Sequence, residues 1–457
     1  MEDLRTRRGF LRLAAGAAAV AVGPGCGSGS DKPKATSTGK ASGPAGGRRT
    51  LRIVLLSHFV PAHDAWFDKE YVARWGEEHD VSVLVDHIPF NEVSSRADAE
   101  VAARGPHDIF GFVDSPAIYE DETIDHRDVF EEISGRFGRA IPLVERCVVN
   151  PKTGKVWGCP HYWVANVAHY RIDLWNKMGA GSAPRTWQDL IQAAPRLKGL
   201  GYPLGIGFAQ EGDSNYSLIS LLHANGAFLQ DEGGTLTINR PATVEAVKIG
   251  TDLFKAGLSD DVFAWDASSN NRSLLDGRAS LIFNAVSAIR AMEIEKPELA
   301  ADVALAPMPT IPGRGPARAV YIVGVNVIWR FSENQDLAKQ FLVDLAATQR
   351  DAFVRSGFYN LPPFEGAAAE LAEFVARDAA PQPPAKYALL ADAASWSTNI
   401  GHPGPANAAC MEVFHRFLVP KMFADVARGE MSAEDGVRLA EAQIQPIFEK
   451  WRERGKI

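Results

Sequence analysis

The chain has 457 residues, of which 46% are hydrophobic and 23% charged, and its formal net charge at pH 7 is −8. This composition is ordinary for a globular protein, and the length is enough for two or three domain-sized units. The negative balance, with no basic block after residue 50, argues against a nucleic-acid partner, and four cysteines are too few for a disulfide scaffold.

The first 25 residues have the pattern of an export signal. Arg7-Arg8 precede Gly-Phe-Leu and an Ala-rich run, as in a twin-arginine signal peptide. The apolar run 10–22 is too short to span a bilayer as a stable helix and contains Arg12. We therefore expect residues 1–25 to be a signal peptide.

Cys26 follows Val-Gly-Pro-Gly and resembles the cysteine of a bacterial lipobox, although Pro24 is unusual at its position. Lipidation of Cys26 would anchor the protein to a membrane surface. The alternative is an ordinary cleaved signal peptide, after which Cys26 has no special role. Residues 26–50 are rich in Gly, Ser, Lys, Thr and Pro, a composition that predicts a flexible tether.

The chain then alternates between strand-like and helix-like segments. Strands are expected at 51–56, 81–85 and 109–113, with helices after the first, where Phe67, Tyr71 and Trp75 recur every four residues, and at 93–104. This order predicts a parallel α/β sheet with right-handed crossovers, in which ligands bind beyond the carboxyl ends of the strands.

Two loops at such strand ends are candidate binding loops. The first carries His58, Phe59 and His63, and the second carries Asp114. A metal site would need a third and a fourth ligand at a sensible spacing, and none is visible nearby. Contact with a ligand and a plain loop both stay open for the histidines, and Asp114 could instead cap a helix, because Pro116 follows it.

The stretch 154–175 indicates a passage from one lobe into another. Its first half alternates and ends at Pro160, as a strand ends, and its middle carries Tyr162, Trp163 and Asn166. A strand that brings aromatic and amide side chains through the middle of a chain suits a cleft between two lobes.

The second half of the chain offers further candidates. Thr186 is expected to cap a helix in which Trp187 is a core residue. The segment 212–216, with Asn215, is polar enough to line a cleft, and Asn284 ends a strand, where it could cap a helix or contact a ligand.

The strand 320–329 is expected to cross back to the first lobe with Tyr321 facing the cleft. The irregular stretch 392–407 carries Trp396, as a stacking ring or a packing residue, and His402. An amphipathic pair of helices then ends near Trp451.

Several motifs resemble, in order and spacing, those of the bacterial solute-binding proteins of sugar ABC importers, the maltose-binding-protein-like family. They are Gly154-Lys155-Val156-Trp157-Gly158-Cys159-Pro160 followed by Tyr170, Asp173 and Leu174; Pro184-Arg185-Thr186-Trp187-Gln188-Asp189-Leu190; and Leu274 with Gly277-Arg278-Ala279. Arg171-Ile172 replaces the usual Asn-Lys, and Ala285 stands where Gly is usual.

The resemblance implies an α/β, two-lobed periplasmic-binding-protein-like fold of type II, each lobe a mostly parallel sheet flanked by helices. Residues 51–163 and 325–380 would form lobe 1, and residues 164–320 and 385–457 lobe 2, joined by several hinge crossings. The implied function is that of a monomeric lipoprotein, anchored to the outer face of the cytoplasmic membrane, that delivers a carbohydrate or polyol to the permease subunits of an ABC importer.

The resemblance also implies no catalysis, no cofactor and no metal. It places Asp114 where an Asp accepts hydrogen bonds from sugar hydroxyls, Asn360 in a turn at the cleft edge, and Trp396 near a stacking ring. A sugar ring needs flat side chains for its C–H face and carboxylates and amides for its hydroxyls, each such hydrogen bond contributing about 1 kcal/mol. The predicted ligand-binding residues are His58, Phe59, His63, Asp114, Tyr162, Trp163, Asn166, Asn215, Asn284, Tyr321, Asn360, Trp396 and His402.

Two alternatives stay open at this stage. The same fold could bind a polyamine, a peptide or a metal chelate. A secreted carbohydrate-active enzyme is less favoured, since the sequence has no Gly-x-Ser-x-Gly, phosphate loop or dinucleotide fingerprint, although a carboxylate pair is invisible in sequence. Cys147 and Cys159 could form a disulfide or stay as buried thiols.

Overall fold

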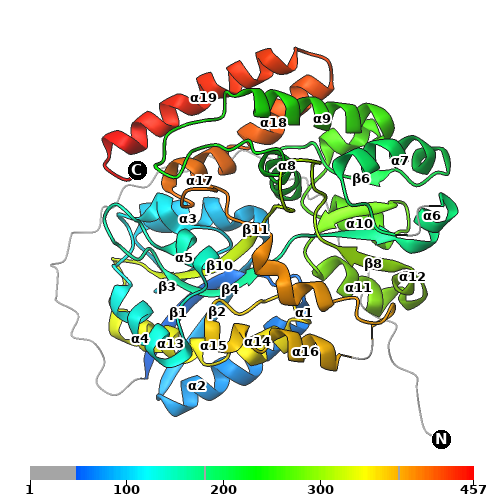
Figure 1. Ribbon diagram of the computed structural model, residues 1–457. Coiled ribbons are helices and arrows are strands. Elements are labelled where there is room, and N and C mark those ends of the chain that lie inside the picture. The colour runs from blue at the N-terminus through cyan, green and yellow to red at the C-terminus, as the bar shows by residue number, and fades with distance from the viewer. Residues whose placement is uncertain (1–47, 180–181, 379–380) are drawn as a thin grey trace, which may run out of the picture. The chain divides into compact units, whose positions relative to one another are not determined.

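The computed structural model describes residues 48–179, 182–378 and 381–457 (Figure 1). The predicted signal peptide, most of the tether and the predicted lipidation residue Cys26 lie outside these residues. Of the helices within them, none combines the length and the apolar character that a membrane span needs.

The first sheet has the strand order β2-β1-β3-β10-β4. Its strands are β1 (Arg49–Leu56), β2 (Val81–Ile88), β3 (Ile109–Phe112), β4 (Cys159–Val164) and β10 (Ile322–Ile328). β1 pairs in parallel with β2 and β3, as the alternating pattern predicted, and β10 is antiparallel to both β3 and β4. One strand, β10, therefore runs against the other four.

The second sheet has the order β6-β7-β5-β8. Its strands are β5 (Val167–Arg171), β6 (Leu204–Gly205), β7 (Leu281–Asn284) and β8 (Val303–Ala306). β6 and β7 are parallel, whereas β5 is antiparallel to β7 and β8. Each sheet is thus mostly parallel with one reversed strand, which confirms the two-lobed α/β fold. We call the elements around the first sheet the first lobe and those around the second sheet the second lobe.

The two reversed strands are the ones that enter from the other lobe. β5 follows β4 after only Ala165 and Asn166, and β10 follows β9 (Ala319–Val320) after Tyr321. The expected strand at 320–329 is therefore two strands broken at Tyr321. The Asn166 amide donates a 2.7 Å hydrogen bond to the Val320 carbonyl, so the two crossings are tied together. A third segment, β11 (Ser397–Thr398), pairs in parallel with β9.

Helices cover both faces of the first sheet (Figure 1). They are α1 (Pro61–Trp66), η1 (Phe67–Val72), α2 (Ala73–Glu78), η2 (Phe90–Glu92), α3 (Val93–Ala103), η3 (Pro116–Tyr119), α4 (Arg127–Phe137), α5 (Pro142–Val148), α13 (Gln335–Ala346), α14 (Gln349–Arg355) and α15 (Glu365–Ala368). The side chains of β1 alternate between two apolar clusters, because successive residues of a strand face opposite ways: Ile53 lies in one and Val54 in the other.

The helix expected after the first strand runs from α1 through a π-helical turn, η1, into α2. Its predicted apolar residues Phe67, Tyr71 and Trp75 are buried, and each ring lies within 6.5 Å of the ring of Phe341 on α13. The spacing of four residues therefore marked the core-facing side of this helix.

The second lobe and the C-terminal region are mostly helical. Their helices are α6 (Ile172–Lys177), α7 (Trp187–Gly199), α8 (Gly212–Ala224), α9 (Pro241–Gly257), η4 (Asp260–Ala264), α10 (Ser269–Leu275), α11 (Ser287–Glu295), α12 (Pro297–Ala301), α16 (Leu371–Arg377), η5 (Ala388–Ser395), α17 (Ala408–His415), α18 (Leu418–Ala427) and α19 (Ala433–Glu453). The predicted cap and core residue of α7 are confirmed: Thr186 and Asp189 form a capping box, and Trp187 is buried.

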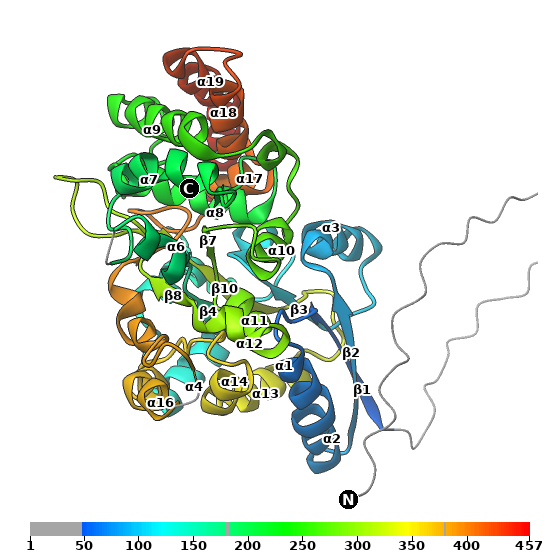
Figure 2. The same cartoon turned by 90° about the vertical axis from the view of Figure 1, so that its right-hand side faces the viewer.

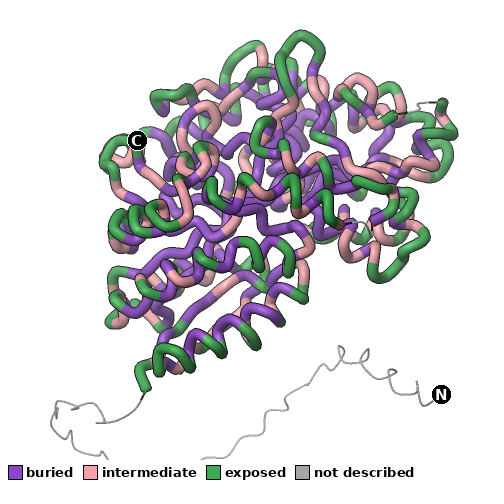
Figure 3. Tube along the Cα trace, turned by 60° about the horizontal axis from the view of Figure 1, so that its bottom comes forward, coloured by how far each residue is buried: buried purple, intermediate pink, exposed green. Residues whose placement is uncertain are grey.

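The C-terminal helices pack onto the second lobe. α18 and α19 lie side by side against α9, as both views of the ribbon show (Figures 1 and 2). Buried positions concentrate along the strands and the inner turns of the helices, and exposed positions on the outer turns (Figure 3). The predicted amphipathic helices near the C-terminus are therefore confirmed.

Cys147, Cys159 and Cys410 are free, buried thiols, so Cys147 and Cys159 do not form the disulfide that their sequence left open. The Cys147 sulfur lies 2.9 Å from the Tyr321 hydroxyl, and burial raises the pKa of Cys147 to about 12. These thiols act as packing residues.

Gly324 allows a tight contact in the first sheet. A Cβ at this position would lie 2.4 Å from the ring of Tyr162 on the neighbouring strand, and the register shifts between Gly324 and Val325. The absence of a side chain at Gly324 therefore lets the Tyr162 ring lie flat across β10.

We predict that Gly324→Ala destabilises the protein by about 1–3 kcal/mol, because the new methyl group must displace the Tyr162 ring. Gly135→Ala is the matched control: Gly135 is exposed on α4, and no heavy atom outside its own helix turn lies within 4 Å of the point that the new methyl group would occupy. The control change should therefore stabilise the protein by about 0.5–1 kcal/mol. Urea unfolding of both variants measures this, and an unchanged Gly324→Ala midpoint would contradict the packing account.

Candidate functional site

Three tyrosines from different elements come together between the lobes. They are Tyr162 on β4, Tyr216 on α8 and Tyr359 in the loop after α14, and we call them the tyrosine cluster. The rings of Tyr162 and Tyr359 are 6.5 Å apart. Burial, and then the charges of Asp114, Tyr359, Asp213 and Tyr162, raise the pKa of Tyr216 far above its usual value.

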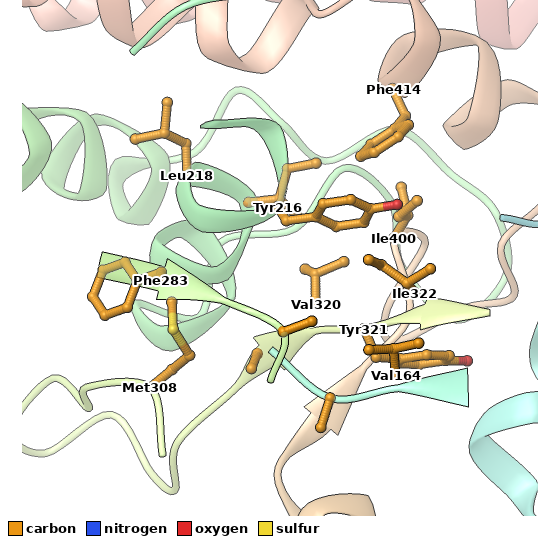
Figure 4. Packing of buried hydrophobic residues seen from close by; sticks show 14 of the residues in the cluster. Val164, Tyr216, Leu218, Phe283, Met308, Val320, Tyr321, Ile322, Ile400 and Phe414 are labelled. Atoms are coloured by element: carbon orange, nitrogen blue, oxygen red, sulfur yellow. The ribbon is translucent and has the colours of Figure 1, made fainter. Parts of the chain in front are cut away.

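The Tyr216 side chain extends from α8 between Phe414 on one side and Val320 and Ile322 on the other (Figure 4). Tyr216 is only 3% exposed, and its hydroxyl has no hydrogen-bond partner among the described residues. Leaving a buried hydroxyl unpaired costs about 1–3 kcal/mol, so this group is poised to bond to a guest molecule or to water.

His58 and Asn360 form part of the first-lobe wall. The Val60 amide donates to His58 Nδ1 at 2.9 Å, so Nε2 carries the proton and donates to Asn360 Oδ1 at 3.0 Å. Burial, reinforced by His63, lowers the pKa of His58 to about 4, so the ring is neutral near pH 7. The amide nitrogen of Asn360 is buried and has no acceptor within the described part of the chain, which leaves a second donor free.

His63 lies behind His58, where the two rings are stacked 4.2 Å apart. Both ring nitrogens of His63 lack partners among the described residues, and His58, His63, His161 and Asn326 border an internal cavity of about 30 Å³. This is room for about one water molecule. Within the described ranges, no group of three or more His, Cys, Asp or Glu side chains is placed to hold a metal ion.

Asp114 accepts a 2.7 Å hydrogen bond from His415 Nε2, at the end of α17. Burial lowers the pKa of His415, but the charge of Asp114 and its hydrogen bond outweigh it, and the net pKa is raised. The cap of η3 is Ser115, without a side-chain bond, so the alternative that Asp114 caps a helix is wrong. Asp114 instead joins the first lobe to the C-terminal helices.

The second-lobe wall is built from amides and carboxylates. The Asn284 amide nitrogen lies 2.6 Å from Asn271 Oδ1 and 3.1 Å from Asp213 Oδ2. Glu211 caps α8 by accepting from the amides of Asp213 and Ser214. Because α11 begins only at Ser287, Asn284 does not cap it.

An aromatic rim runs along the first-lobe side of the site. Phe59 is 38% exposed, and its ring lies 6.1 Å from both the Phe90 ring and the Tyr359 ring. A Cβ at Gly212, the first residue of α8, would lie 3.0 Å from the Phe90 ring. Phe90 of the first lobe therefore contacts the second lobe directly beside Asp213.

Three predicted ligand residues have structural roles at the crossings. Trp163 is 1% exposed, and its indole nitrogen donates to the Pro362 carbonyl at 3.0 Å. The Asn166 amide nitrogen donates to the Val320 carbonyl and so links the two crossings. The Tyr321 hydroxyl donates to the Leu143 carbonyl. The indole nitrogen of Trp163, the amide nitrogen of Asn166 and the Tyr321 hydroxyl are therefore engaged by backbone carbonyls of the described residues.

Three further predicted residues have other surroundings in the structure. Asn215 is fully buried and donates to the Phe414 carbonyl at 2.8 Å, and Trp396 is a core residue at 8% exposure. His402 lies 5.5 Å from His223, near the last residue of α8, about 15 Å along that helix from Asp213. The stacking and packing alternatives for Trp396 both remain predictions.

The structure thus brings together His58, Phe59, Asp114, Tyr162, Asn284 and Asn360 of the predicted set. Asp213 and Tyr216 lie in the segment 212–216 that was expected to line a cleft, but they were not among the predicted ligand residues. Tyr359, Asn271, Phe90 and His415 were not predicted as ligand residues either. Helical spacing could have found two of them, since Asp213 and Tyr216 are three residues apart and share a face of α8. The contacts of His415 and Phe90 span long sequence separations and left no local signal.

The family model described as bacterial extracellular solute-binding protein matches residues 61–349, more than half of the chain. A Deinococcus radiodurans protein described as an ABC transporter-binding protein is 25% identical over 177 residues, which cover 37% of this chain and 42% of that protein. The alignment therefore spans less than half the length of the curated relatives it matches.

Two solved structures show the same fold. A sugar transporter from Arthrobacter chlorophenolicus with bound laminaribiose is 17% identical, with a TM-score of 0.73, and covers 88% of this chain and 99% of its own. A solute-binding protein from Agrobacterium radiobacter in complex with ribitol is 14% identical, with a TM-score of 0.70, and covers the same shares of both chains.

The Asp114–His415 pair predicts a pH-dependent stability. Because the folded pKa of His415 is raised, the pair stabilises the protein fully below the unfolded pKa of about 6.5 and loses that effect as pH rises through the folded value. Asp114→Asn should therefore cost about 1–2 kcal/mol near pH 5 and less near pH 8.

Urea unfolding at several pH values measures this difference. Asp252→Asn, at an exposed position of α9, is the control and should unfold like the unmodified protein at every pH. An equal loss for Asp114→Asn at both ends of the pH range would show that the pair is not ionic.

Proposed function

The chain belongs to the family of bacterial extracellular solute-binding proteins, and on that premise we propose that it captures a carbohydrate or polyol between its two lobes. The observation that carries this proposal is the set of unpaired donors around the tyrosine cluster. The Tyr216 hydroxyl and the Asn360 amide nitrogen are buried without partners within the described residues, so the site offers hydrogen bonds that a ligand can complete.

The residue types of the site suit a sugar. The exposed Phe59 and the rings of Phe90 and Tyr359 offer an apolar face for the C–H groups of a pyranose. Asp213 and Asn284 on the opposite wall supply oxygens and amide protons for its hydroxyls. Several such bonds of about 1 kcal/mol each, made in a site that excludes water, are needed for useful affinity.

The crossings between the lobes allow the site to open and close. β4 passes into β5 through two residues, and β9 passes into β10 through Tyr321, so the lobes are joined by short segments. The contact of Phe90 with Gly212 would separate when the lobes part, and a bound sugar would favour its closure. The family is one of binding proteins, and we propose no chemical step.

We further propose that the closed protein delivers its ligand to the permease subunits of an ABC importer. The Deinococcus radiodurans relative is described in those terms, and the structural neighbours hold laminaribiose and ribitol. Lipidation of Cys26 and the tether 26–50 would keep a monomeric binding protein near a permease at high local concentration, on the outer face of the cytoplasmic membrane.

The experiment is a thermal-shift screen of mono-, di- and trisaccharides and polyols, followed by calorimetry. A ligand at 100 times its Kd adds about 2.7 kcal/mol of stability. For the best binder we predict that Tyr216→Phe weakens binding about tenfold, because it removes one hydroxyl that bonds to the sugar, while the ring and the fold stay intact.

Tyr202→Phe is the matched control, since Tyr202 packs under Arg171 after α7 and should leave the affinity unchanged. A screen in which no carbohydrate or polyol stabilises the protein would refute the proposed function. If the Tyr216→Phe variant and the unmodified protein bind the sugar with equal affinity, the Tyr216 hydroxyl does not contact the ligand and the tyrosine cluster is not the binding site.

A further inference from the structure

The second-lobe wall carries two carboxylates, Glu211 and Asp213, at the start of α8. Each carboxylate has a negative neighbour among the described residues, Asp266 for Glu211 and Glu211 for Asp213. Burial and then the charge of Asp266 raise the pKa of Glu211. Burial and then the charge of Glu211 raise the pKa of Asp213 well above its usual value. Glu211 is satisfied as a helix cap, whereas Asp213 is bonded only through side-chain amides.

The described groups around the tyrosine cluster offer no free cation to offset this charge. His58 is neutral, because Nδ1 accepts from Val60 and burial lowers its pKa to about 4. His415 is engaged by Asp114 at 2.7 Å. Arg272, on α10, is paired with the exposed Asp266 at 2.9 Å. The net charge of the site is therefore negative when Asp213 is ionised.

A second observation points to a ligand at the same place. The buried Tyr216 hydroxyl has no hydrogen-bond partner among the described residues, and Tyr216 lies three residues after Asp213 on the same face of α8. Burial, and then the charges of Tyr162 and Asp213, raise the pKa of Tyr359 far above its usual value. Aromatic rings next to a carboxylate attract cations through their faces, and this attraction grows when water is excluded.

We propose that the ligand of this site is an amine-bearing carbohydrate, such as an amino sugar, whose ammonium group binds Asp213 beside Tyr216 and Tyr359. This inference rests on the proposed function and adds the class of sugar to it. The aromatic rim of Phe59 and Phe90 favours a ring with a C–H face over a flexible polyamine. A charge-assisted bond from an ammonium to a carboxylate is worth roughly tenfold or more in affinity over a neutral one.

The test compares sugars that differ only at carbon 2. The probes are glucosamine, N-acetylglucosamine and glucose, and their β-1,4-linked dimers, titrated by calorimetry into the intact protein near neutral pH. We expect the free amine to bind about tenfold more tightly than its acetylated and hydroxyl counterparts. Asp213→Asn should remove that preference, whereas Asp252→Asn should keep it.

Two measurements guard against a misfolded variant. Without ligand, Asp213→Asn should unfold at no lower a temperature than the unmodified protein, because the change removes a half-buried carboxylate that Glu211 repels. In the unmodified protein, the preference for the amine should grow as the pH rises and Asp213, whose pKa lies well above its usual value, loses its proton while the amine keeps its own.

The outcomes separate the two proposals. The amine assignment is wrong if glucose or its dimer binds as tightly as the amine sugar, or if the Asp213→Asn variant still prefers the amine sugar. Either result leaves the proposed carbohydrate binding unaffected. If the protein binds spermidine but none of these sugars and none of the wider carbohydrate panel, both the amine-sugar assignment and the proposed carbohydrate binding are wrong.

Discussion

The hydrogen bond from Asn166 to the Val320 carbonyl fixes the two points at which the chain passes between its sheets. Everything at the site is placed relative to this link. β4 brings Tyr162 to the crossing, β10 accommodates its ring at Gly324, and the reversed strands β5 and β10 carry the chain away into the two sheets.

The unpaired polar atoms of the candidate site are costly to leave without a hydrogen-bond partner. A native core pairs nearly all of its buried polar atoms, yet the Tyr216 hydroxyl and the Asn360 amide nitrogen have no partners among the described residues. Asp213 adds a carboxylate that burial drives toward its neutral form. Unsatisfied groups that cluster between two hinged lobes lower the stability of the ligand-free protein, and a ligand that completes their bonds recovers this free energy on binding.

Local patterns in the sequence predicted the scaffold well and the site only in part. The four-residue spacing of Phe67, Tyr71 and Trp75 and the capping box at Thr186 are local signals, and both are confirmed. Asp114 and Asn284 could be found because strand ends in α/β sheets gather at one edge. Trp163 could not be assigned from its sequence, because an aromatic residue on a crossing strand has the same pattern whether it faces the core or a cleft.

The central claim, that a carbohydrate completes the bonds of the tyrosine cluster, is tested most directly by a crystal structure of the protein saturated with the sugar that binds it best. The account predicts sugar or amine groups within about 3 Å of the Tyr216 hydroxyl and the Asn360 amide nitrogen, with a sugar ring against the aromatic rim of Phe59 and Phe90. A sugar bound elsewhere, with both donors still unpaired, would contradict it.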